Sequence, residues 1–118
     1  MDTKNDKAPF VIQITQAGMG SGDPALQMKL IQKYLTLLNE SNMLPAVISF
    51  YNDGVKLVVE GSPVLNELAA LEQRGVRLIV CQTCLNHYNL SDQLRVGIVG
   101  GMTDIIEAQW RTEKVITL

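Results

Sequence analysis

The chain has 118 residues, a length that fits one ordinary domain with its own hydrophobic core. Hydrophobic residues make up 47% and charged residues 19%, which excludes the compositions typical of disordered chains and coiled coils. Lys and Arg number 10 against 12 Asp and Glu, a formal net charge of -2. This balance gives no electrostatic reason to expect a nucleic acid or a membrane as partner.

The first residues carry no apolar run, and no segment has the length of a membrane span. We therefore expect a cytoplasmic protein, with residues 1–9 as a polar N-terminal lead and residues 10–118 as a single domain. Two cysteines are too few for a disulfide scaffold. In a reducing compartment a close cysteine pair favours redox, sulfur-transfer or metal chemistry over a structural bridge.

The first half of the chain alternates strand and helix patterns. A branched apolar run predicts a strand at 10–15, and a glycine-rich turn follows at 16–23. Asp23 and Pro24 form a helix start, in which Asp23 caps the helix and Pro24 occupies its first turn. The predicted helix runs to Glu40, with one broad apolar face made by Leu26, Leu30, Ile31, Tyr34, Leu35 and Leu38.

The second half continues the alternation. The expected elements, in order, are a strand at 46–51, one or two helical turns at 55–60, a helix that begins at Ser62-Pro63 and ends at Gly75, a strand at 76–81, a helical turn at 83–88, a strand at 95–99, a helix at 103–112 and a last strand at 114–118. Nearly continuous apolar strands that alternate with helices predict a three-layer α/β/α domain, with a mainly parallel sheet of about five strands.

In a parallel sheet, ligands bind beyond the carboxyl ends of the strands. Glycine-rich and polar segments follow four of the predicted strands, so we expect the site at this edge. Its candidate ligand-binding residues are Gly18, Gly20, Gly22, Asn52, Gly54 and Thr83. The glycine turn matches neither the dinucleotide fingerprint nor a phosphate loop, so it serves either as a flexible turn or as a close approach to a small ligand.

Cys81 and Cys84 are the strongest chemical signal, because Cys81 ends a predicted strand and Cys84 lies in the following turn. A helix N-terminus favours the reactive thiolate, whereas burial favours the neutral thiol, and the sequence leaves this balance open. Cys81 also fits a small buried residue that closes a strand. His87, the single histidine, is spaced to share a helical face with Cys84 and is a candidate proton-transfer group or a plain surface residue. No fourth Cys or His is present to complete a zinc site with these three, so we expect no metal.

The segment Leu78-Ile-Val-Cys-Gln-Thr-Cys-Leu85 resembles the strand-end cysteine segment of the DsrE/DsrF-like (TusD-related) sulfur-relay proteins. Within that family the chain is most similar to the carboxyl-terminal domain of YedF-type proteins. Three further stretches carry this similarity: residues 50–57, Glu60-Gly-Ser and residues 114–118. The resemblance extends from Phe10 to the last residue.

The resemblance implies a three-layer α/β/α fold and a protein that carries sulfur as a cysteine persulfide. If the chain is an enzyme, the activity that the resemblance implies is that of a sulfurtransferase. It assigns the sulfur-accepting role to Cys81 and leaves the role of Cys84 less defined. The implied partners are sulfur-donor and sulfur-acceptor proteins, among them a TusA-like carrier, together with further copies of the chain. A transient cysteine persulfide takes the place of a cofactor. YedF-type chains usually carry an amino-terminal TusA/SirA-like domain with its own sulfur-carrying cysteine. This sequence begins almost directly at the first predicted strand, so we expect that partner to be missing or encoded separately.

Two other functions fit the residues. In the first, the chain is a non-catalytic oligomeric binding or scaffold module with inert cysteines. In the second, Cys81 and Cys84 form the CxxC pair of a dithiol oxidoreductase.

Overall fold

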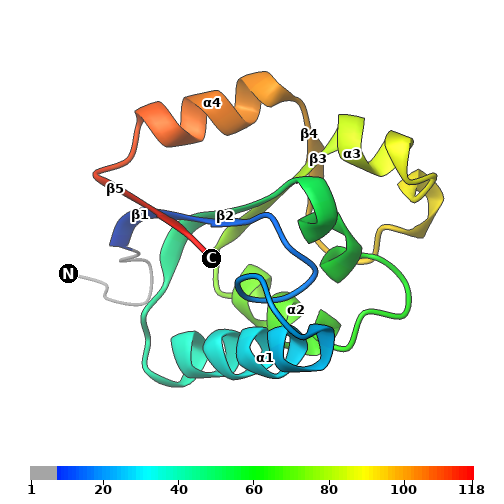
Figure 1. The fold of residues 1–118 in the computed structure, drawn as a ribbon. Coiled ribbons are helices and arrows are strands. Elements are labelled where there is room, and N and C mark those ends of the chain that lie inside the picture. Colours follow the sequence, from blue (N-terminus) through cyan, green and yellow to red (C-terminus); the bar gives the residue numbers. More distant parts are fainter. Residues whose placement is uncertain (1–7) are drawn as a thin grey trace.

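The computed structural model describes residues 8–118 and contains a five-stranded sheet in which every pair of neighbouring strands is parallel (Figure 1). Its strand order is β4-β3-β2-β1-β5. The strands are β1 (Ala8–Ile14), β2 (Pro45–Phe50), β3 (Arg77–Cys81), β4 (Ile98–Gly100) and β5 (Lys114–Thr117). The α-helices are α1 (Pro24–Glu40), α2 (Leu65–Gln73), α3 (Gln82–His87) and α4 (Met102–Trp110), and the 3-10 helices are η2 (Asn52–Val58) and η3 (Ser91–Gln93). Residues 1–7 of the predicted polar lead lie outside the described residues.

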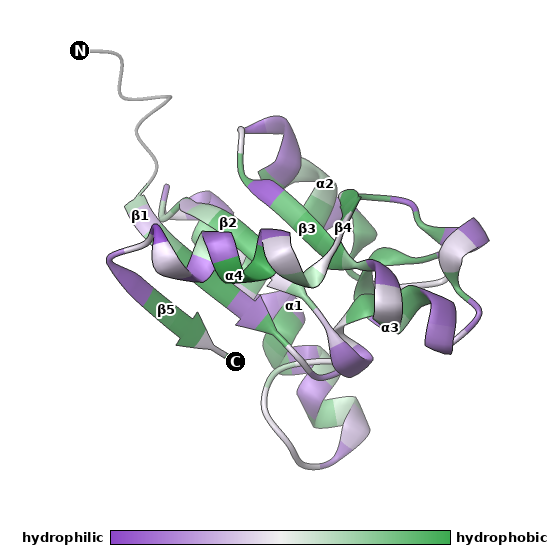
Figure 2. Cartoon of the chain, turned by 90° about the horizontal axis from the view of Figure 1, so that it is seen from above, coloured by the Kyte–Doolittle hydropathy of each residue, from purple (hydrophilic) through white to green (hydrophobic). Residues whose placement is uncertain are grey.

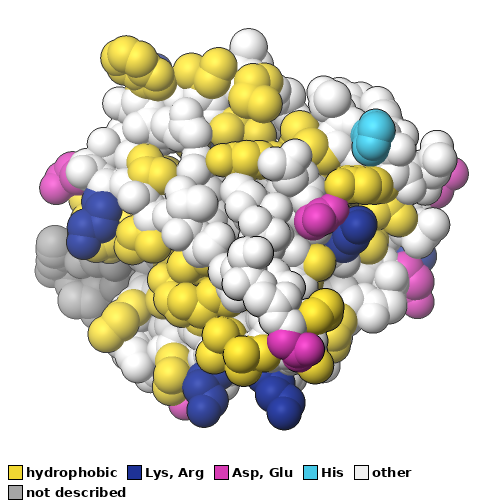
Figure 3. Space-filling view, viewed as in Figure 1, with side chains coloured by type: hydrophobic (Ala, Val, Ile, Leu, Met, Phe, Trp, Pro, Cys, Tyr) yellow, Lys and Arg dark blue, Asp and Glu magenta, His cyan; other side chains and the backbone are white. Residues whose placement is uncertain are grey.

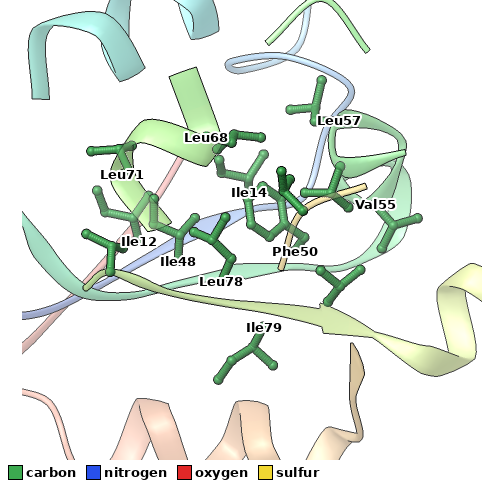
Figure 4. Packing of buried hydrophobic residues seen from close by; sticks show 14 of the residues in the cluster. Ile12, Ile14, Ile48, Phe50, Val55, Leu57, Leu68, Leu71, Leu78 and Ile79 are labelled. Atoms are coloured by element: carbon green, nitrogen blue, oxygen red, sulfur yellow. The ribbon is translucent and has the colours of Figure 1, made fainter. Parts of the chain in front are cut away.

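Helices cover both faces of the sheet. α1 and α2 lie on one face and α4 lies on the other, so the predicted three-layer α/β/α architecture is confirmed (Figures 1 and 2). Successive side chains of a strand point to opposite faces, and the sequence supplies apolar residues for both. Ile12, Ile48 and Leu78 lie on the side of Leu68 from α2, whereas Ile79 points towards the opposite layer (Figure 4).

Local signals explain two of the helix ends. The backbone N–H of Leu26 donates to Asp23 Oδ2 at 3.1 Å, and Pro24 is the first residue of α1, which confirms the predicted start. Gly75 follows α2 with φ +94°, the left-handed conformation expected of a glycine just beyond a helix. The predicted end of this helix is therefore confirmed as well.

The predicted start of the same helix, with Ser62 as cap and Pro63 as first residue, is displaced by two residues. α2 begins at Leu65, and its preceding residue, Val64, makes no capping contact through its side chain. Ser62 Oγ instead accepts a hydrogen bond from the backbone N–H of Val64 at 3.3 Å. The hydroxyl thus closes a local turn before the helix, a use of Ser that competes with capping.

The fourth strand is also displaced from its predicted place, since β4 starts at Ile98 rather than at Arg95. The N–H groups of Arg95 and Val96 donate to the carbonyl oxygen of Val58, at 2.9 and 3.4 Å, so this stretch is bound to the end of η2. Gly97 then turns the chain with φ +85°. Only after this turn does the chain enter the sheet.

The apolar face of α1 is wider than the core requires. Ile31 and Leu35 are fully buried, whereas Leu26 and Leu30 from the same predicted face are exposed. The same holds for α4, where Ile105 is buried and Trp110 is 84% exposed. None of the helices within residues 8–118 has both the length and the apolar character needed to cross a membrane.

Candidate functional site

The carboxyl ends of β2 and β3 lie next to each other, because these strands are parallel neighbours in the sheet. The chain leaves β2 into η2 and leaves β3 directly into α3, so both helices begin at the same edge. Seen from above, α3 lies beyond the end of β3 and β4 (Figure 2). The expected gathering of the segments at 52–54 and 81–88 is therefore present.

The two cysteines occupy different environments at this edge. Cys81 is the last residue of β3 and is only 2% exposed, whereas Cys84 in the first turn of α3 is partly exposed. Neither is in a disulfide. The pair thus consists of an inner thiol within the core and an outer thiol that a reagent can reach.

The Cys84 thiol is held against the start of η2. The backbone N–H of Asn52 donates a hydrogen bond to Cys84 Sγ at 3.1 Å. Asn52 has φ +52°, a left-handed conformation that Asn adopts more readily than most residues. This conformation is part of the turn that brings the N–H group to the sulfur.

Burial decides the acid–base balance that the sequence leaves open. Loss of hydration is the largest effect on Cys84 and raises the pKa of its thiol, and hydrogen bonding with the Cys81 thiol raises it further. The Asn52 N–H group acts in the opposite direction but does not outweigh these effects. At neutral pH the Cys84 thiol therefore carries its proton in a larger fraction of molecules than the thiol of an ordinary cysteine does.

A small polar network lies beside the cysteines and joins η2 to α3. The Tyr88 hydroxyl donates to Asp53 Oδ1 at 2.6 Å, and Lys56 Nζ lies 3.2 Å from the same oxygen. The Lys56 ammonium also lies over the Tyr88 ring, 4.5 Å from its centre. The hydrogen bond from Tyr88, followed by that from Lys56, lowers the pKa of the Asp53 carboxyl, and the same contact with Asp53 raises the pKa of Tyr88.

Sequence reasoning missed this network. Asp53 and Lys56 are three residues apart in a predicted turn, which is a usable local signal for an ion pair. Tyr88 lies 35 residues from Asp53, and no local pattern links the two. Only the pairing of β2 with β3 brings them together.

Two of the predicted ligand-binding glycines have packing roles. A Cβ atom on Gly54 would lie 1.9 Å from the carbonyl oxygen of Ile14, so this glycine lets η2 pass directly against the end of β1. A Cβ atom on Gly18 would lie 2.6 Å from Gln27 in α1. Both glycines therefore permit close backbone approach within the fold.

The rest of the glycine turn is bound to α1. The side-chain amide of Gln27 donates to the Gly20 carbonyl, and the Met19 N–H donates to the Gln27 carbonyl at 2.9 Å. Gly20 adopts φ +72°, and Gly22 is exposed. Of the two interpretations of this turn, its geometry favours a structural turn, and a ligand role for Gly18, Gly20 and Gly22 stays a prediction.

Thr83 and His87 are both exposed on α3. The His87 ring meets the Tyr88 ring edge-on, with 5.2 Å between the ring centres. Its role in proton transfer stays a prediction. Within residues 8–118, no three His, Cys, Asp or Glu side chains converge in a way that would hold a metal ion.

A hollow of about 400 Å³ opens beside the polar network. Tyr88 and Lys56 form part of its wall, and the segment Glu60-Gly-Ser-Pro63 forms another part. Glu60 is held by Arg95, whose Nε lies 2.8 Å from the Glu60 carboxylate. The hollow is therefore bordered by charges of both signs and by a tyrosine ring.

These features define an α/β protein with a dithiol at the carboxyl edge of a parallel sheet. A family model described as the DsrE/DsrF-like family matches residues 7–118, and the chain belongs to this family. A search of curated proteins found no match.

Solved structures with the same fold share little sequence with this chain. The protein of unknown function MTH1491 from Methanobacterium thermoautotrophicum is 19% identical, with a TM-score of 0.69 over 96% of this chain and 100% of that chain. The ychN protein from E. coli is 17% identical, with a TM-score of 0.68 over the same shares. BT1422 from Bacteroides thetaiotaomicron, a conserved protein of unknown function, is 15% identical, with a TM-score of 0.64 over 93% of this chain and 95% of that chain. At these identities the likeness concerns the fold.

Proposed function

We propose that the protein is a sulfur-relay component that carries sulfane sulfur as a persulfide on the Cys81–Cys84 pair. The observation that carries the proposal is the pairing of an outer and an inner free thiol at the carboxyl end of β3. Membership of the DsrE/DsrF-like family, which is associated generally with sulfur relay, supports it. The segments similar to YedF-type proteins support a TusA-like carrier as the donor.

The burial of the two thiols favours entry of sulfur through Cys84. The resemblance assigns the accepting role to Cys81, but a donor protein has little access to a residue that is 2% exposed. In the proposed first step the Cys84 thiolate attacks the outer sulfur of a donor persulfide. The donor leaves as its thiolate, and Cys84 becomes a persulfide.

Cys81 then acts as the inner partner. Its thiolate attacks the outer sulfur on Cys84, so the Cys84 thiolate is released and the sulfur rests on Cys81, away from solvent thiols. Delivery reverses these steps and ends with attack by an acceptor thiolate on the Cys84 persulfide. Each step breaks one sulfur–sulfur bond and forms another, so no external oxidant or reductant is consumed.

The raised pKa of Cys84 predicts slow loading from small reagents at neutral pH, because the thiolate is the reacting form. The hollow beside Tyr88 is a place where a donor protein could dock. A docked donor that carries a positive charge near Cys84 would lower the pKa of this thiol and favour transfer. Small-molecule persulfides would lack this effect.

The test is to treat the reduced protein with a persulfide donor and to measure its intact mass. Wild type should gain one sulfur atom per chain, Cys81→Ser should still gain it, and Cys84→Ser should gain much less. A wild type that gains no sulfur from any persulfide donor, protein donors included, would contradict the proposed function. If Cys84→Ser loads as well as wild type while Cys81→Ser does not, the function stands and the entry residue is Cys81.

A dithiol oxidoreductase is a second candidate, because Cys81 and Cys84 are both free, stand at CxxC spacing, and the Cys81 thiol is near enough to raise the pKa of Cys84. The raised pKa of Cys84 weighs against it, since efficient CxxC pairs lower the pKa of the attacking thiol. This candidate requires a Cys81–Cys84 disulfide that forms reversibly in the folded protein. Thiol titration after treatment with oxidised glutathione would detect that disulfide.

A further inference from the structure

The Cys84 thiol lies on the shortest α-helix among residues 8–118. α3 has only six residues, and a helix of this length is not stable by itself in water. Its position therefore depends on contacts with the rest of the fold. Leu85, which is 1% exposed, anchors the inner side of α3 in the core. One buried residue fixes how deep the helix lies but not how it is rotated, so other contacts have to orient the side that carries Cys84.

η2 provides a fixed support for α3. A Cβ atom on Gly54 would lie 1.9 Å from the Ile14 carbonyl oxygen, and the same carbonyl accepts a hydrogen bond from the Tyr51 N–H at 3.2 Å. The side chains of Val55 and Leu57 are buried in the core. η2 therefore cannot shift without disturbing the sheet, and contacts made to it keep α3 in a defined place.

Two consecutive residues of η2 bind two successive turns of α3. The Asn52 N–H donates to Cys84 Sγ at 3.1 Å, and the Tyr88 hydroxyl donates to Asp53 Oδ1 at 2.6 Å. The Tyr88 N–H also donates to the Cys84 carbonyl oxygen at 3.1 Å, and residues four apart lie on the same side of a helix. Sulfur is a weak acceptor, whereas a short hydrogen bond to a carboxylate is a strong one. The contact between Asp53 and Tyr88 is therefore the stronger of the two.

Lys56 supports this stronger contact. Its ammonium lies 3.2 Å from Asp53 Oδ1 and 4.5 Å from the centre of the Tyr88 ring, so it balances the carboxylate charge and packs on the ring that donates to it. The side chains of Asp53 and Lys56 are 44% and 45% exposed. In the view of Figure 3, an acidic and a basic side chain lie together over η2, below the single histidine (cyan). The network therefore reaches the surface beside the outer thiol.

We propose that Asp53 and Tyr88 are positioning residues of the sulfur site: their hydrogen bond fastens α3 to η2 and so keeps the Cys84 thiol in place. We call this hydrogen bond the η2–α3 clamp. The inference rests on the proposed function, in which sulfur passes from Cys84 to Cys81. Cys81 belongs to the sheet and cannot move towards its partner, so the transfer requires that α3 keep Cys84 within reach.

The clamp also maintains the surroundings that set the acidity of Cys84. Burial is the largest effect that raises the pKa of this thiol, and the neighbouring Cys81 thiol adds to it. A helix that turns outward after loss of the clamp loses both effects, and the loss of the Asn52 N–H acts in the opposite direction with less weight. We therefore expect the pKa of Cys84 to fall towards its ordinary value. A residue that only supports the global fold would leave this pKa unchanged in the folded protein.

The clamp can be removed without unfolding the chain, because the far end of η2 is joined separately to the segment that follows α3. The Glu60 N–H donates to the Gln93 carbonyl at 2.8 Å, and the Arg95 N–H donates to the Val58 carbonyl at 2.9 Å. Tyr88→Phe removes only the hydroxyl, so the ring keeps its packing against the core. We expect this variant to fold.

The test is the rate at which iodoacetamide alkylates Cys84 in the folded protein, followed by mass spectrometry from about pH 6 to pH 10. Tyr88→Phe should react about threefold or more faster at neutral pH, and its rate should level off at a lower pH than that of wild type. The factor is smaller than the roughly tenfold effect of a buried hydrogen bond to a charge, because the pair is nearly half exposed. Tyr34→Phe makes the same chemical change in α1 and is the matched control, which should keep the wild-type profile. Circular dichroism checks that each variant is folded.

Asp53→Ala tests the clamp from the side of η2. It should also speed the alkylation of Cys84. In an Asp53→Ala background Tyr88→Phe should change nothing further, because the two residues share one hydrogen bond. If the two effects add, the carboxylate acts through its charge alone and the proposal is wrong. A folded Tyr88→Phe with the wild-type pH profile overturns it as well.

Sulfur transfer gives a second readout. After loading from a persulfide donor, Tyr88→Phe should lose its sulfur to added glutathione about threefold or more faster than wild type, because the pair is less well enclosed. Equal rates of loss would overturn the positioning role. A wild type that takes up no sulfur from any donor would contradict the proposed function, whereas the alkylation profiles still decide whether the clamp keeps Cys84 in place.

Discussion

Gly54→Ala should destabilise the protein strongly, although alanine adds only one methyl group. The new Cβ would lie 1.9 Å from the Ile14 carbonyl oxygen, so the backbone of η2 or the end of β1 has to move. Overpacking of this kind costs about 1–3 kcal/mol. The same carbonyl accepts a hydrogen bond from the Tyr51 N–H at 3.2 Å, and loss of this hydrogen bond would add about 1 kcal/mol to the destabilisation.

The expected decrease in the free energy of unfolding is therefore about 2–4 kcal/mol, which corresponds to a Tm lower by roughly 10 °C for a domain of this size. Urea and thermal unfolding measure it. Gly22→Ala is the control, because a Cβ there meets no heavy atom within 4 Å, and its Tm should stay close to that of wild type. If Gly54→Ala unfolds within about 0.5 kcal/mol of wild type, the inferred close approach of η2 to β1 is wrong.

Three further predictions concern buried or paired polar groups. Ser49→Ala should stabilise the fold by about 1 kcal/mol, because Ser49 Oγ is buried without a hydrogen-bond partner, and a loss of stability on urea unfolding would mean that the hydroxyl has a partner. Tyr88→Phe should raise the pKa of Asp53 in an NMR titration, because the Tyr88 hydroxyl is the largest cause of its lowered value, and an unchanged titration would refute this role. The stability that the lowered pKa provides is present above the unfolded-state pKa of Asp53 and is lost as pH falls through its folded-state pKa. Iodoacetamide should label Cys84 alone in the native protein, because Cys81 is buried. The labelling rate should rise about tenfold per pH unit and continue to rise beyond pH 8.5, roughly the usual thiol pKa, because the pKa of Cys84 is raised. A rate that levels off below that pH would show a lowered pKa instead.

The alternation of elements and the caps at Asp23 and Gly75 could be predicted because each depends on residues close together in the chain, and that alternation in turn indicates a parallel sheet. The extent of burial on a helix could not. The apolar pattern of α1 is the same for Ile31, which is fully buried, as for Leu30, which is exposed, because periodicity identifies the apolar residues but not what packs on them. Leu26 and Leu30 of that pattern therefore lie on the surface of the described chain.

Within the site, the sequence located the cysteines and the turn at 52–54 but not the contact between them. The hydrogen bond from Asn52 to Cys84 joins residues 32 positions apart and involves a backbone group, which no side-chain pattern reports. Likewise, the pKa of Cys84 depends on how deeply the first turn of α3 is packed, which is a property of the assembled fold. Gly18 and Gly54 are conspicuous in the sequence, but the groups closest to them are Gln27 and the Ile14 carbonyl of the fold itself.

The hydrogen bond to Cys84 comes from the main chain, and this affects how the site can vary. A substitution at position 52 changes the side chain but keeps the N–H group, so a single mutation does not delete the donor unless it introduces proline. What selection can act on is the left-handed backbone, which Asn, Asp and Gly tolerate and β-branched residues do not. The contact should therefore persist through sequence drift as a restriction on residue type at position 52, although the side chain at that position takes no part in the contact.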